Sequence, residues 1–94
     1  MYKIGQKTNR MYARYYILRD GALFIYKNID QKFPSNVIPL RGFYIVPLLE
    51  DKNSNFYGFI MYHENKAFKR RRLYHTNKDA CFNWIEVLKE QASN

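Results

Sequence analysis

The 94-residue chain has little cysteine, little histidine and few acidic residues, and each shortage excludes a class of protein. The single cysteine, Cys81, cannot form an internal disulfide or a cysteine-rich zinc site. Its isolation is compatible with a reducing compartment. No apolar run approaches the roughly 20 residues that a transmembrane helix needs, and no secretory signal peptide opens the chain. We therefore expect a soluble, cytoplasmic protein.

The sequence also has few residues and motifs that could support catalysis. His63 and His75 have no third metal-ligating group at a suitable spacing, and no glycine-rich phosphate loop is present. The three serines lie in expected loops or in the C-terminal tail. The Glu50-Asp51 pair is typical of solvated loop charge, and Cys81 lies on the apolar stripe of an expected helix, where a buried structural thiol is favoured over a nucleophile. We expect no enzyme, no catalytic residue, no metal and no cofactor.

Positive charge and aromatic residues are plentiful. Lysine and arginine together number 16 against 8 acidic residues, which gives a formal net charge of +8, and the chain holds nine tyrosines and seven phenylalanines. Such a charge favours polyanions, either phospholipid headgroups or nucleic acid. The length predicts a single domain over residues 1–94, and the abrupt start in a strand is compatible with a domain excised from a longer protein.

The first three quarters of the chain predict short strands. Residues 12–18 and 22–26 form a hairpin through the turn Arg19-Asp20-Gly21, and further strands are expected over residues 37–40, 43–48, 57–63 and 71–75. Pro39 and Pro47 lack a backbone N–H, so their strands should be short or lie at sheet edges.

Helical periodicity is confined to the C-terminal end. Thr76 or Asn77 can cap a helix whose apolar stripe consists of Cys81, Trp84, Ile85 and Leu88. Trp84 is expected to fill the core. Together with a strand at the N-terminus, the pattern predicts a mostly β fold of about seven strands. A bent antiparallel sandwich or barrel capped by one C-terminal helix would protect the strand edges of so small a domain.

The N-terminal 18 residues carry four basic residues and no acid: Lys3, Lys7, Arg10 and Arg14. Alternation along a strand puts Arg14 on the same face as Tyr16 and Leu18, which should face the core. A buried, isolated guanidinium is unfavourable, so Arg14 needs an anionic partner. A phosphate would satisfy it through bidentate hydrogen bonds. The alternatives are an ion pair with a distant acid such as Glu64, or extension of the side chain into water.

A second basic group follows in an expected loop and strand, and consists of Lys66, Lys69, Arg70, Arg71 and Arg72. It can be a solvated edge whose charges prevent strand pairing. It can equally be a membrane-facing patch attracted to an anionic leaflet, at about 1 kcal/mol per basic residue. The two interpretations are compatible.

One pattern favours nucleic acid. Residues 57–62, Tyr-Gly-Phe-Ile-Met-Tyr, match the end of the aromatic motif with which RNA-recognition domains stack bases. Asn55 and Phe56 stand where that motif has a basic residue and a glycine, and no helix follows the first strand. We therefore rank nucleic acid third among the candidate ligands.

The ordered combination of these features resembles a pleckstrin homology domain. The resemblance is carried by Lys3-Ile4-Gly5, by the block from Arg14 to Leu23, by Val37-Ile38-Pro39-Leu40 and by the helix with Trp84. It spans essentially the whole chain. It implies a seven-stranded, strongly bent antiparallel sandwich or barrel with a C-terminal helix as its cap.

The resemblance also implies a ligand site. Lipid-binding members hold inositol phosphates with a lysine of the first strand and two basic residues of the second, and Lys3 and Arg14 match the first and last of these. Tyr12 stands at the middle position and can supply a hydroxyl, while Lys7 and Arg10 can reach phosphates from the first loop. The sequence thus predicts a peripheral membrane-targeting module for phosphoinositides or other anionic phospholipids, with limited headgroup selectivity. The alternative is a protein-interaction adaptor with little lipid specificity.

Overall fold

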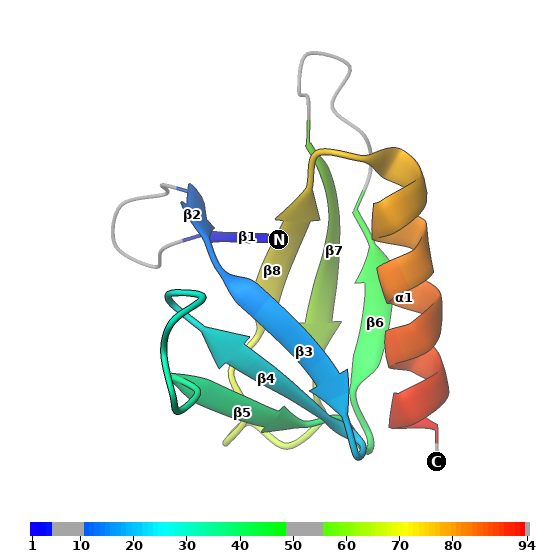
Figure 1. The fold of residues 1–94 in the computed structure, drawn as a ribbon. Coiled ribbons are helices and arrows are strands. Elements are labelled where there is room, and N and C mark those ends of the chain that lie inside the picture. Colours follow the sequence, from blue (N-terminus) through cyan, green and yellow to red (C-terminus); the bar gives the residue numbers. More distant parts are fainter. Residues whose placement is uncertain (5–10, 49–55, 94) are drawn as a thin grey trace.

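The computed structural model describes residues 1–4, 11–48 and 56–93. In chain order the elements are β1 (Tyr2–Ile4), β2 (Met11–Ala13), β3 (Tyr15–Arg19), β4 (Ala22–Tyr26), β5 (Asn36–Pro39), β6 (Tyr44–Pro47), β7 (Tyr57–Tyr62), β8 (Arg71–His75) and α1 (Lys78–Ala92). The strands form two antiparallel sheets, one with the order β2-β1-β8-β7-β6 and the other with the order β3-β4-β5 (Figure 1).

The strand expected over residues 12–18 is divided at Arg14, where the chain passes from one sheet to the other. The backbone N–H of Arg14 donates to the carbonyl of Met1 at 2.9 Å, and the Met1 amino group donates to the Arg14 carbonyl at 3.3 Å. One residue later Tyr15 is paired with Tyr26 of β4. Because β2 and β3 are two parts of one bent strand, the described residues contain seven strands. The mostly β fold with a C-terminal helix is confirmed.

The turn and edge predictions agree with the structure. Asp20 and Gly21 have φ angles of 52° and 72°, as a tight two-residue hairpin between β3 and β4 requires. Pro39 and Pro47 end β5 and β6, which are the outermost strands at one side of their sheets. The strand expected from residue 43 begins one residue later, because the Phe43 N–H donates to the Leu40 carbonyl in the preceding turn.

The core lies between the two sheets and against α1. Its buried side chains are Leu23, Ile25, Ile38, Leu40, Phe43, Ile45, Phe59, Met61, Leu73, Cys81, Ile85 and Leu88. Trp84 is only partly buried and packs against this cluster from its border, so it contributes to the core without filling its centre. The complete burial of Phe59 and Met61 also removes both side chains from any base-stacking surface of the kind that an RNA-recognition motif requires.

The helix begins as its sequence predicts. Asn77 is the N-cap, and its side-chain oxygen accepts a hydrogen bond of 3.0 Å from the Ala80 N–H. α1 packs on β6, β7 and β8 and covers one side of the molecule (Figure 1). Near its C-terminus, the Ala92 carbonyl accepts from the Gly42 N–H at 3.2 Å. No helix within the described residues is long and apolar enough to cross a membrane.

Candidate functional site

Arg14 occupies the point where the bent strand changes sheets. Its guanidinium Nη1 donates to the Ala13 carbonyl at 2.7 Å, and the guanidinium carbon lies 5.3 Å from the centre of the Tyr12 ring. The side chain is partly buried, and the residues flanking it, Ala13 and Tyr15, are exposed. Arg14 therefore lies on the inward-facing side of the bent strand, as the sequence predicts, and Tyr12 lies beside it on the same side.

Lys3 lies in β1, where its backbone is in register with Tyr12 on one side and Leu73 on the other. Partial burial is the main cause that lowers the pKa of Lys3 below its ordinary value, and repulsion from four other cations lowers it further. Those cations are Arg14, Arg71, Lys27 and Lys69. We call Lys3 and these four residues the basic cluster.

The basic cluster is assembled from segments that are distant in the sequence. Lys3 comes from β1 and Arg14 from the junction of β2 and β3, whereas Lys27 directly follows β4. Lys69 precedes β8, and Arg71 is its first residue. The cluster thus joins strand ends of both sheets, which is where a bent sandwich can receive a ligand from outside.

No described carboxylate neutralises the basic cluster. Among the described residues, the ion pair within 4.0 Å is Arg19–Asp20, at 3.8 Å, and both of its side chains are exposed. Glu64, the acid that could have paired with Arg14, instead accepts a hydrogen bond of 2.9 Å from the Tyr44 hydroxyl through its Oε1. The site therefore concentrates positive charge without an internal counter-ion in the described part of the chain.

Tyr16 and Arg71 are partly buried beside one another at the inner side of the basic cluster. The Tyr16 hydroxyl is buried and has no hydrogen-bond partner among the described residues. Burial raises the pKa of Tyr16 to about 12, although the charges of Arg14 and Arg71 oppose that rise. Burial likewise lowers the pKa of Arg71, and Tyr16 opposes that shift. A phenol hydroxyl with no acceptor in the described part of the chain thus lies close to two guanidinium groups.

The structure brings together part of the predicted headgroup site. Lys3, Tyr12 and Arg14 are neighbours on β1 and the bent strand. Lys7 and Arg10 lie outside the described residues, so their role stays a prediction. Lys27 and Tyr16 belong to the same surroundings and were not predicted as site residues. Strand alternation could have predicted Lys27 as a site residue, because it follows Leu23 and Ile25, the buried residues of β4, at the same spacing of two residues.

The second basic group is divided by the fold. Lys69 and Arg71 join the basic cluster, and the exposed Arg72 faces the other side of β8. Arg70 places its guanidinium carbon 5.2 Å from the centre of the Tyr62 ring, and Lys66 is exposed in the preceding loop. The two predicted patches are therefore not separate surfaces, because Lys69 and Arg71 link them.

Residues with catalytic potential serve structural roles. The Nδ1 atoms of His63 and His75 accept backbone hydrogen bonds from Asn65 and Asn77, at 2.9 and 3.0 Å. Cys81 is buried, and burial raises the pKa of its thiol. Within the described residues no group of three or more His, Cys, Asp or Glu side chains could hold a metal ion.

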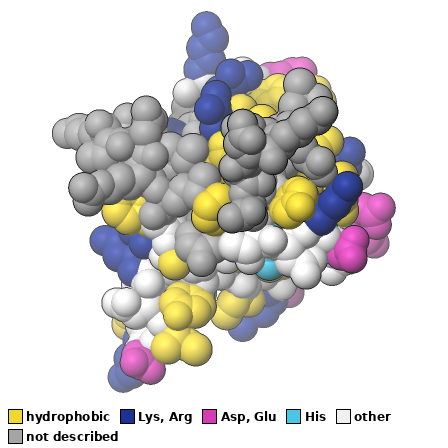
Figure 2. Space-filling model, turned by 90° about the horizontal axis from the view of Figure 1, so that it is seen from above, with side chains coloured by type: hydrophobic (Ala, Val, Ile, Leu, Met, Phe, Trp, Pro, Cys, Tyr) yellow, Lys and Arg dark blue, Asp and Glu magenta, His cyan; other side chains and the backbone are white. Residues whose placement is uncertain are grey.

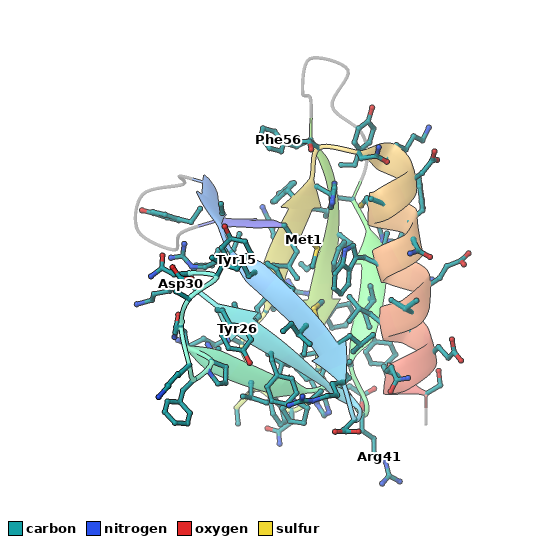
Figure 3. The ribbon with its side chains drawn as sticks, viewed as in Figure 1. Met1, Tyr15, Tyr26, Asp30, Arg41 and Phe56 are labelled. Atoms are coloured by element: carbon teal, nitrogen blue, oxygen red, sulfur yellow. The ribbon has the colours of Figure 1, made fainter. Side chains whose placement is uncertain are left out.

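A second surface lies on the outer face of the three-stranded sheet. Ile17, Phe24 and Val37 are in register across β3, β4 and β5, and Ile17 and Val37 are 49% and 45% exposed. At the end of this face an open hollow of about 510 Å³ is lined by Ala13, Tyr15 and residues Lys27–Gln31. Figure 3 shows Tyr15 and Asp30 near one another at this end of the molecule.

Comparisons with known proteins agree with this architecture. The carboxyl-terminal PH domain of pleckstrin, a crystal structure, superimposes with a TM-score of 0.79 at 22% identity, covering 99% of this chain and 90% of that chain. No curated protein sequence matches the chain. The family model of the PH domain, a module that commonly mediates membrane or protein interactions, matches residues 1–93. The chain therefore belongs to the PH domain family.

Proposed function

We propose that this domain binds anionic phospholipid headgroups, phosphoinositides among them, at the basic cluster and so attaches its parent protein to the cytoplasmic surface of a membrane. One observation carries the proposal: Lys3 and Arg71 are partly desolvated beside other cations, without a described carboxylate to neutralise them. Such an arrangement is unfavourable in the free protein and becomes favourable when an anion enters. PH domains are generally non-catalytic binding modules, which agrees with a binding role.

The chemistry of the cluster suits a phosphate group. The Arg14 guanidinium can donate two parallel hydrogen bonds to phosphate oxygens, and Lys3 can contribute a compact charge from the neighbouring strand. The Tyr16 hydroxyl, for which the described residues supply no acceptor, can donate a further hydrogen bond. Lys27 and Lys69 surround this centre, and Lys7 and Arg10 of the first loop would extend it. In this proposal Tyr12 orients Arg14 through its ring.

The remaining basic residues would attract the domain to an anionic membrane without distinguishing one headgroup from another. Lys66, Arg70 and Arg72 are exposed, so each would contribute on the order of 1 kcal/mol near an anionic leaflet. Their contribution should fall as salt increases, because the Debye length shortens to about 10 Å at 0.1 M ionic strength. Headgroup selectivity would instead depend on the more enclosed Lys3, Arg14, Tyr16 and Arg71.

Substitution of Arg14 tests the proposal directly. Arg14→Ala should weaken co-sedimentation with vesicles of phosphatidylcholine, phosphatidylserine and phosphatidylinositol bisphosphate by about tenfold or more, because one bidentate charged contact contributes roughly 1.5–3 kcal/mol and each 1.4 kcal/mol is a factor of ten in affinity. Arg41→Ala is the matched control, since Arg41 is exposed and lies away from the cluster, at the lower end of the molecule in Figure 3. Equal vesicle binding by a folded Arg14→Ala variant and the control would refute this site.

A protein-interaction adaptor is the second candidate. The observation in its favour is the apolar row of Ile17, Phe24 and Val37, in which Ile17 and Val37 are exposed and could be covered by a partner. Figure 2, which views the molecule from above, shows hydrophobic side chains close to lysine and arginine side chains at several places on the surface. A stable complex that Ile17→Asp abolishes and Arg14→Ala leaves intact, together with no binding to any anionic vesicle, would establish the adaptor role instead.

A further inference from the structure

The loop between β4 and β5 presents two large apolar side chains to solvent. Ile29 is 76% exposed and Phe33 is 77% exposed, more than any other large hydrophobic side chain of the described residues. Both belong to a loop of nine residues, numbers 27–35, that joins Tyr26 to Asn36. Two such side chains on one short loop are unfavourable in water unless a partner covers them.

The loop is held in shape by hydrogen bonds around Gln31. The Gln31 Oε1 accepts from the Lys27 N–H at 2.9 Å, and its Nε2 donates to the Phe33 carbonyl at 2.6 Å and to the Ser35 Oγ at 2.9 Å. The Gln31 N–H donates to the Asn28 carbonyl at 3.2 Å. The polar groups of the loop thus bond to one another around Gln31, and Ile29 and Phe33 remain exposed outside this network.

The loop begins at the basic cluster. Lys27, its first residue, is one of the cations that repel Lys3, and the preceding residue, Tyr26, is in register with Tyr15, directly after Arg14. Lys32 adds a second positive charge between Ile29 and Phe33, against one acid, Asp30. Figure 3 places Asp30 at the outer end of the three-stranded sheet, on the side away from α1. Apolar and cationic groups therefore occur together at one end of the molecule.

We propose that Ile29 and Phe33 insert into the interfacial region of an anionic bilayer when the basic cluster binds its headgroup. This inference rests on the proposed function. The occupant is a lipid bilayer because an anionic leaflet offers both kinds of partner that this end of the molecule calls for: negative charge for Lys27 and Lys32, and acyl chains for the two apolar side chains. A preformed loop loses little conformational entropy on insertion, so its apolar burial contributes fully to binding.

Vesicle binding of alanine variants is the first test. Ile29→Ala and Phe33→Ala should each weaken binding to the vesicles defined above by about tenfold, as expected for one partly inserted apolar side chain. The matched control is Phe82→Ala, because Phe82 is 46% exposed on α1, across the molecule from the loop (Figure 1). The tenfold effect should persist at high salt, whereas the effect of Arg14→Ala should shrink as charge is screened.

Site-directed labelling is the second test. Cys81 is buried, so a polarity-sensitive fluorophore will react with an introduced thiol in Phe33→Cys or, as a control, in Phe82→Cys. On vesicles the emission of the label at position 33 should shift to the blue and be quenched by brominated acyl chains. The label at position 82 should keep its aqueous emission. The wild-type chain serves as the labelling blank.

The outcomes separate this inference from the proposed function. Vesicle binding with an unshifted label at position 33 would overturn the insertion and leave headgroup binding intact. Absence of binding by the wild-type chain would overturn both. A shift that depends on protein concentration without vesicles, together with a dimeric mass, would assign the loop to a second copy of the chain and refute the bilayer as its occupant.

Discussion

Lys3 and Arg14 lie on adjacent strands and repel one another. The Lys3 backbone is in register with Tyr12, two residues before Arg14 on the same face of the strand. Burial is the main cause that lowers the pKa of the Lys3 ammonium, and the Arg14 guanidinium lowers it further. Arg71 acts on Lys3 in the same direction from β8. Two guanidinium groups from other strands thus repel the Lys3 ammonium near the junction of the sheets, and an anion at that point would relieve this repulsion.

Replacement of Lys3 should raise the stability of the folded chain and weaken its binding to anionic vesicles. Lys3→Met removes a desolvated charge beside other cations, so we expect unfolding free energy to rise by roughly 0.5 kcal/mol and the melting temperature by about 2–4 °C. Binding to anionic vesicles should weaken several-fold. Thermal denaturation and co-sedimentation measure the two effects, with Arg41→Met as the control. A variant that is less stable than wild type would contradict the repulsion.

The stability difference should depend on pH in one direction. Since the pKa of Lys3 is lower in the folded chain, the unfolded chain binds the proton more tightly, and the destabilising effect is complete at neutral pH. It should disappear as the pH rises past the ordinary lysine value of 10.5. The advantage of Lys3→Met over wild type should therefore vanish in alkali, which denaturation at several pH values will check.

Tyr16→Phe removes the hydroxyl that has no described partner. We expect the free protein to be as stable as wild type or up to about 1 kcal/mol more stable, because a buried unsatisfied group is lost. Anionic vesicle binding should weaken on the order of tenfold if the hydroxyl donates to a phosphate. Tyr44→Phe is the control, since the Tyr44 hydroxyl bonds to Glu64. Wild-type vesicle binding by the Tyr16 variant would exclude the hydroxyl from the site.

The same substitution has an alkaline signature. The pKa of Tyr16 is raised to about 12 from the ordinary value of 10.0, so the unfolded chain loses this proton more readily than the folded chain. Ionisation of Tyr16 therefore costs no stability below pH 10, and stability is lost as the pH rises from 10 toward 12. In an ultraviolet titration, Tyr16→Phe should show one tyrosine fewer that ionises well above pH 10. Between pH 10 and 12 the variant should lose less stability than wild type.

Asn77→Ala should destabilise the helix without affecting ligand binding. The N-cap hydrogen bond to the Ala80 N–H is lost, and we expect the unfolding free energy to fall by about 1 kcal/mol. Asn83→Ala is the matched control, because Asn83 is exposed within the helix. Urea denaturation measures the difference. An equal loss in both variants would show that the cap contributes nothing specific.

Gly42→Ala and Gly21→Ala should differ in severity. Both glycines have positive φ, 86° and 72°, so both alanine variants are strained by about 1 kcal/mol. A Cβ at Gly42 would also lie 2.6 Å from the His63 Nε2, whereas nothing lies within 4 Å at Gly21. The His63 ring packs against the rings of both Phe43 and Phe68, which restricts its movement. Equal stabilities in urea would contradict this contact.

Local signals in the sequence predicted the local structure. The Arg19-Asp20-Gly21 turn, the short strands that end at Pro39 and Pro47, and the helix capped by Asn77 all occur as expected. Each depends on residues within one turn or strand: two consecutive positive φ angles, a missing N–H donor, and a side-chain acceptor at a helix start. These features require no knowledge of the partner strands.

Long-range features were not predictable in the same way. The break at Arg14 arises because β2 pairs with β1 and β3 pairs with β4, and no property of residue 14 alone indicates it. The approach of Lys69 and Arg71 to Lys3 depends on the pairing of β1 with β8. The sequence therefore predicted two separate basic groups where the fold forms one basic cluster, because the register between distant strands cannot be inferred from local sequence.

The prolines at the outer strands have a consequence for how other chains can approach. The N–H groups of Leu40 and Leu48 donate inward, to the carbonyls of Gly21 and Gly58, so the alternate positions, Pro39 and Pro47, face the free borders of the sheets. Each border thus lacks a donor where an incoming extended chain would need one. Polymerisation by strand addition along β5 or β6 is interrupted at that point, and flat contact with a sheet face remains the easier mode of association.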